Sequence, residues 1–113
     1  MLTLQALQEA GVNTKEGLAR CMNNESFYLN LVTKALMKDD CDKLKTAIEA
    51  GDLDSAFSAA HNLKGSMGNL AITPIYKPVA EMTELLRSRT QTDYTPYLDT
   101  VMQQKETLAS LLK

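Results

Sequence analysis

The chain is poor in the residues that mark many common functional classes. Its 113 residues include one histidine, two cysteines, no tryptophan and two phenylalanines. Two cysteines are too few for a disulfide-rich scaffold. The N-terminus lacks the charged start and continuous apolar stretch of a signal peptide, so we expect Cys21 and Cys41 to be buried or free thiols. These scarcities favour a small cytoplasmic domain.

Long apolar runs and an excess of one charge are also missing. No apolar stretch approaches the roughly 20 residues of a transmembrane helix, so we expect no membrane partner. The 12 basic and 14 acidic residues give a formal net charge of −2. Because no basic stripe with interleaved aromatics occurs, we expect no nucleic-acid partner. Neither a nucleotide-type glycine loop nor a nucleophile elbow is present, so we predict that the chain is not itself an enzyme. We also expect a monomer.

The residues that are plentiful favour helices. Leu, Ala, Met, Lys and Glu are common, and apolar positions recur every three or four residues rather than every second one. Gly51 can adopt the left-handed conformation that ends one helix, and Asp52 can cap the next. Such tight links imply antiparallel neighbours. We predict an all-α fold, an antiparallel four-helix bundle with one or two short N-terminal helices, forming a single domain over residues 1–113.

The predicted helix over residues 53–70 carries the lone histidine. At about 100° per residue, His61 lies about 130° from the centre of the helix's apolar stripe, and Gly65 about 170°. Lys64 lies about 70° away, at the edge of the stripe. His61 is therefore expected to face solvent, with Lys64 and Gly65 as neighbours on the next turn. The stripe itself consists of Leu53, Ala56, Ala60, Leu63, Met67 and Leu70.

These residue types suit a phosphoryl carrier. A neutral imidazole is a competent nucleophile near neutral pH and can form a phosphoramidate. Lys64 would supply positive charge to the phosphate oxygens. Gly65 and Gly68 each cost a helix interior roughly 0.5–1 kcal/mol relative to alanine. Gly65 faces away from the predicted core, so packing against the core does not explain why a glycine stands there. We expect instead that the missing side chain leaves room for a docking partner beside His61.

The motif in this helix resembles histidine-containing phosphotransfer (HPt) domains. Their signature is a histidine, an apolar residue two positions later, and then lysine, glycine and a small residue. The matching run is His61-Asn62-Leu63-Lys64-Gly65-Ser66. The motif covers about a dozen residues, and the helix layout agrees over most of the chain.

The resemblance implies a role for each motif residue. His61 would be phosphorylated, Lys64 would assist, and Gly65 would permit docking of a receiver domain from a response regulator or hybrid histidine kinase. Small and apolar residues around His61 would complete the contact face, for which Phe57, Ser58 and Gly68 are candidates. The chain would need no cofactor or metal of its own, because the receiver's acidic pocket would supply magnesium.

Two positions depart from the family pattern. Many members carry glycine where Ala71 stands. Some orient the histidine with a glutamine from the following helix, and Thr83 lies near that place here. The stretch Ile75-Tyr76-Lys77-Pro78 also makes the next helix less smooth than in many members. These departures leave open which residue orients His61 and which surface docks the partner.

Two other kinds of function fit the residues less well than a phosphoryl carrier. Cys21, Cys41 and His61 lack the close pairing of zinc motifs, which argues against a metal site. A helical bundle that binds receiver or kinase domains without carrying phosphate is the main alternative. The intact His61, Lys64 and Gly65 argue against it. We expect a free-standing protein, with a domain excised from a hybrid kinase as the other possibility.

Overall fold

The structure is a computed structural model that describes residues 2–112. Met1 and Lys113, the ends of the predicted domain, lie outside the described residues. Within that range the chain forms helices and no strand, so the all-α prediction is confirmed. The helices are α1 (Leu4–Glu9), α2 (Thr14–Arg20), α3 (Glu25–Met37), α4 (Asp40–Glu49), α5 (Leu53–Asn69), α6 (Thr73–Arg87) and α7 (Thr95–Ser110).

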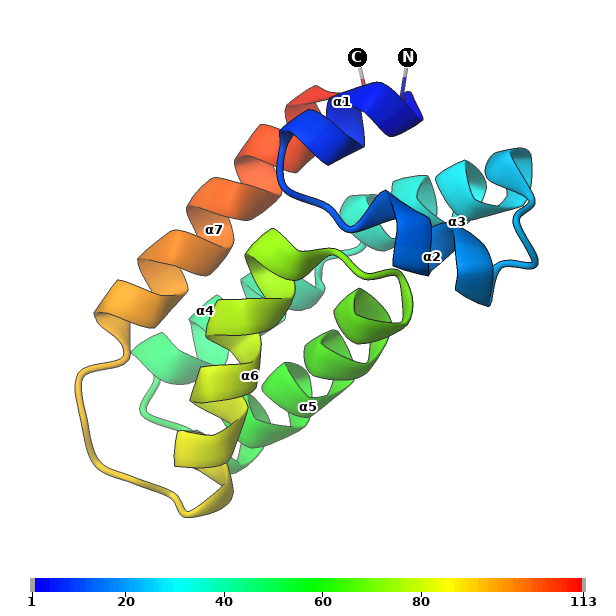
Figure 1. The fold of residues 1–113 in the computed structure, drawn as a ribbon. Helices are drawn as coiled ribbons and strands as arrows, with labels where there is room; N and C mark the ends of the chain where they lie inside the picture. The colour runs from blue at the N-terminus through cyan, green and yellow to red at the C-terminus, as the bar shows by residue number, and fades with distance from the viewer. Residues whose placement is uncertain (1, 113) are drawn as a thin grey trace.

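The four helices α4 to α7 form the bundle (Figure 1). Helix α5 packs between α4 and α6, and α7 packs against α6, α4 and α3. The short helices α1 and α2 precede the bundle, as predicted, and lie at its upper end in Figure 1. Helix α3 is a further long element, which ends where Lys38 takes an extended conformation with ψ of 157°. Like α4, helix α3 packs against α7.

The turn between α4 and α5 has the predicted chemistry. Gly51 has a φ of +71°, in the left-handed region that glycine adopts without strain. The Asp52 carboxylate accepts a hydrogen bond of 3.1 Å from the backbone N–H of Ser55. A turn this short holds α4 and α5 as antiparallel neighbours. It fixes where the helix that carries His61 begins.

The end of α5 is a Schellman turn. The Ile72 N–H donates to the Met67 carbonyl at 2.9 Å, and the Ala71 N–H donates to the Gly68 carbonyl at 3.1 Å. Ala71 occupies the left-handed position of this turn, with a φ of +57°. Glycine is the usual residue at this place in such a turn, because it adopts the left-handed conformation without strain.

A single apolar core lies between the helices. Helix α5 contributes Leu63 and Met67 to it, and α6 contributes Val79, Met82 and Leu86. Burying one such side chain stabilises the fold by about 1.5–3 kcal/mol. The core fixes how α5 is rotated, and hence which of its residues face solvent.

Candidate functional site

The exposed face of α5 carries His61, as predicted. His61 and Gly65 are exposed, whereas Ala60 and Leu63, which flank His61 in sequence on the core side, are fully buried. The rest of the predicted stripe is also buried, except for a half-buried Leu53. The orientation derived from helical spacing is therefore confirmed. It leaves the imidazole accessible to another protein.

The surface beside His61 is hollowed. A shallow hollow of about 310 Å³ is lined by His61, Lys64, Gly65, Gly68, Arg20, Asn69 and Tyr76. The structure thus brings four of the predicted site residues together around one opening. Arg20 and Tyr76 were not anticipated from the sequence. They lie 41 positions before and 15 positions after the histidine, counted from the printed sequence, and no local spacing connects them with it.

The two glycines of this hollow differ in their surroundings. A β-carbon at Gly65 would meet no atom within 4 Å, whereas one at Gly68 would lie 3.0 Å from the Tyr76 ring. Gly68 therefore has a packing reason to be glycine. Gly65 has no such reason among the described residues, which agrees with its predicted place opposite the core. The space above Gly65 is open to a partner.

The Phe57 side chain lies next to the histidine. Its ring stacks on the His61 imidazole, with centroids 5.8 Å apart and planes inclined by 28°. The Arg87 and Arg89 guanidinium carbons lie 5.4 and 4.9 Å from the same ring centroid. Cations over an aromatic face are attracted to its quadrupole. Phe57 is thus held between α6 and His61, and its ring limits the orientations that the imidazole can take.

Lys64 is held near His61 by an acidic residue of α6. Its ammonium lies 3.7 Å from the Glu84 carboxylate, and the other Glu84 oxygen lies 3.5 Å from Arg87 Nε. The Lys64 side chain is 31% exposed, so a ligand can still reach it. An ion pair this exposed contributes little to stability, because solvent screens it. Lys64 remains a mobile cation one turn from the imidazole.

Two other residues named from the sequence lie apart from this hollow. Ser58 is exposed, but it lines a different depression together with Lys43 and Asn62. Thr83 is fully buried, and its hydroxyl donates a 2.7 Å hydrogen bond to the Val79 carbonyl. Thr83 therefore does not orient the imidazole. The residue in contact with the His61 ring is Phe57, which lies on the same helix.

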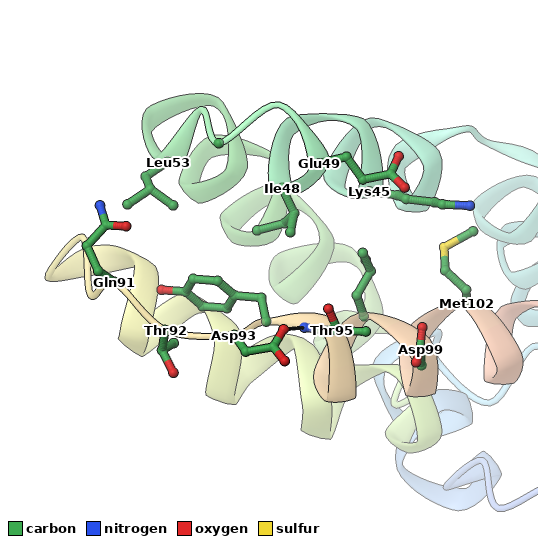
Figure 2. A pocket seen from close by; sticks show the side chains of 13 residues that line it. Lys45, Ile48, Glu49, Leu53, Gln91, Thr92, Asp93, Thr95, Asp99 and Met102 are labelled. Carbon is green, nitrogen blue, oxygen red and sulfur yellow. Dashed lines mark hydrogen bonds between the residues drawn. The ribbon is translucent and has the colours of Figure 1, made fainter.

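A larger hollow lies elsewhere on the bundle, between the end of α4 on one side and, on the other, the first turns of α7 with the segment that joins α6 to α7 (Figure 2). It shares no lining residue with the hollow at His61. Its Asp93 carboxylate accepts a 2.9 Å hydrogen bond from the backbone N–H of Thr95, the first residue of α7. Hydrogen bonds from Thr95 lower the pKa of Asp93. The Asp93 carboxylate thus has a structural partner in the segment that leads into α7.

Cys21 and Cys41 are buried free thiols, as expected. Within residues 2–112, no three His, Cys, Asp or Glu side chains are grouped so that they could hold a metal ion. None of the helices described is both long and apolar enough to cross a membrane. The hollow at His61 is therefore the site with the clearest chemistry.

Comparison with known proteins gives one match. A family model described as the Hpt domain matches residues 32–112, which is most of the chain. The chain therefore belongs to the Hpt domain family. Members of this family serve histidine phosphotransfer in phosphorelays and interact with receiver and kinase domains of two-component systems. No curated protein and no solved structure matches the chain.

Proposed function

We propose that this protein carries a phosphoryl group on His61 between aspartates of receiver domains. The observation that carries the proposal is an exposed imidazole with a cation one turn away and an open glycine beside it. The family membership supports the same function. The chain would act as a carrier, with the catalytic groups supplied by its partners.

The transfer step needs little from this chain beyond position and charge. The imidazole lone pair forms a new N–P bond as the O–P bond to the receiver's aspartate breaks. The aspartate carboxylate leaves with that electron pair. In the second transfer a carboxylate oxygen of the next receiver forms an O–P bond as the N–P bond breaks, and the electron pair of the N–P bond returns to the imidazole. Phosphoryl transfer depends mainly on alignment and charge neutralisation. Phe57 stacking would align the ring, and Lys64 would neutralise part of the phosphoryl charge.

The open space above Gly65 would admit the receiver's active-site loop. A side chain at this position would stand between His61 and the incoming aspartate. Gly68 and Phe57 would form the flanks of the contact face, and Ser58 its outer edge. Magnesium would come from the receiver's acidic pocket, and this chain would hold no cofactor. We also infer a cytoplasmic monomer.

Label transfer tests this function directly. The purified protein is mixed with a radiolabelled phosphorylated receiver domain, and acid-labile, alkali-stable label is sought on this chain. His61→Gln should abolish the label, whereas Asn62→Ala, on the neighbouring exposed position, should retain it. Absence of label with several receivers, or label that survives His61→Gln, would contradict the carrier function. Stable complex formation without label would favour the binding-only alternative.

A further inference from the structure

Arg20 joins the N-terminal helices to the histidine site. It is the last residue of α2, and its guanidinium donates a 2.5 Å hydrogen bond to the Gly68 carbonyl near the end of α5. A second guanidinium nitrogen lies 2.6 Å from a Glu16 carboxylate oxygen. These two contacts place the Arg20 cation on the rim of the hollow that contains His61. The side chain nevertheless stays 46% exposed.

The position of Arg20 in the chain is also informative. The other residues that line the hollow belong to α5 and α6, whereas Arg20 comes from α2. It also lies ahead of residues 32–112, which the family model matches. A charged residue from outside the shared bundle thus borders the opening to the histidine. It is placed to contact a partner that docks over the histidine.

We propose that Arg20 is a docking residue that pairs with a carboxylate of the incoming receiver domain. The inference rests on the proposed carrier function. A guanidinium has five N–H donors and stays charged at all relevant pH values. Since the contacts to Gly68 and Glu16 use two of its nitrogens, donors remain for a partner. A receiver's phosphorylation pocket is acidic, and it approaches over Gly65, next to this cation.

Glu16 has the opposite effect in this arrangement. Its carboxylate neutralises the Arg20 cation in the free protein and would repel an acidic partner. Substitution of Arg20 should therefore weaken docking and substitution of Glu16 should strengthen it, although each breaks the same ion pair. If Arg20 served only to clamp α2 onto α5, both substitutions would loosen the clamp and change docking in the same direction.

The experiment measures phosphoryl transfer from a receiver domain that labels His61. Arg20→Gln should raise the KM for that receiver about three- to fivefold, and Glu16→Gln should lower it by up to about twofold. Maximal rates should stay unchanged, and both effects should shrink at high salt. Arg20→Lys should keep most of the affinity that Arg20→Gln loses. Lysine retains the positive charge, although it cannot make both of the contacts that the guanidinium makes with Gly68 and Glu16. Lys15→Gln, an exposed residue of α2, is the control for net charge.

The possible outcomes test the docking role of Arg20 independently of the carrier function of His61. A KM raised by both Arg20→Gln and Glu16→Gln, or a loss that Arg20→Lys does not recover, would show that Arg20 is only a structural clamp. An equal effect of Lys15→Gln would also overturn the inference, since net charge alone would then suffice. In all of these cases His61 would still be labelled. Absence of label on the unmodified chain would instead overturn the carrier function.

Discussion

A reciprocal exchange of glycine and alanine should stabilise this protein at two positions near the end of α5. Gly65 lies in the interior of that helix, where alanine is preferred. Ala71 has a φ of +57° just past the end of the helix, where glycine is preferred. Gly65→Ala and Ala71→Gly are therefore both expected to raise the free energy of unfolding. Only the first change lies beside His61.

The two gains should differ in size. Gly65→Ala should contribute about 0.5–1 kcal/mol, because nothing within 4 Å opposes the new methyl group. Ala71→Gly relieves about 1–2 kcal/mol of left-handed strain. It also loses a buried methyl group worth about 0.8 kcal/mol, so the net gain should be about 0.5 kcal/mol. A gain of about 1 kcal/mol should raise the Tm of a domain of this size by about 4 °C.

Urea and thermal unfolding measure these gains, and label transfer measures their functional effect. Gly65→Ala should stabilise the fold and slow transfer from a receiver, whereas Ala71→Gly should stabilise it at an unchanged transfer rate. Gly68→Ala is the matched control, because its β-carbon would lie 3.0 Å from Tyr76 and should give no gain. If Gly65→Ala gave a more stable protein with normal transfer, Gly65 would not be a docking gap. If it gave no added stability, the helix-cost argument itself would be refuted.

Three further predictions concern single side chains. Glu84→Gln should slow hydrolysis of the phosphorylated protein by about twofold, measured as loss of label, because Lys64 then pairs with the phosphoryl group alone. Tyr28→Phe should lower the urea-derived stability by about 1–2 kcal/mol, because it leaves the Leu70 carbonyl without its buried 2.8 Å hydrogen bond. Burial raises the pKa of the Cys41 thiol from 9.0 to about 11. The folded state therefore holds that proton more tightly, so stability should fall as the pH rises through this range, and Cys41→Ala should flatten the decline.

Much of this arrangement could be predicted from the sequence because helical spacing is a local property. The apolar stripe of α5 alone determined that His61 and Gly65 face solvent, and both are exposed. The link at Gly51 and Asp52 likewise depends on neighbouring residues, and its φ and hydrogen bond agree with the prediction. Local rules of this kind hold when the core and the helix preferences agree.

What could not be predicted depends on contacts between distant segments. The hydrogen bond from Arg20 to Gly68 joins residues 48 positions apart, and the spacing of apolar residues within a helix does not predict it. The packing of Tyr76 against Gly68 also needs the crossing of α5 and α6, which spacing within one helix does not define. Thr83 has the right place in sequence to orient the histidine, yet its side chain is buried and bonded within α6. The stack of Phe57 on His61 is local, at a spacing of four, and could have been anticipated from it.

The contact between α2 and α5 has a consequence for how such carriers diversify. The guanidinium that borders the hollow is held by a backbone carbonyl of Gly68, and a carbonyl is present whatever side chain the residue has. The charge of residue 20 can therefore change without any change in the side chains of the helix that bears the histidine. Partner choice and phosphoryl chemistry would then evolve on separate parts of the chain.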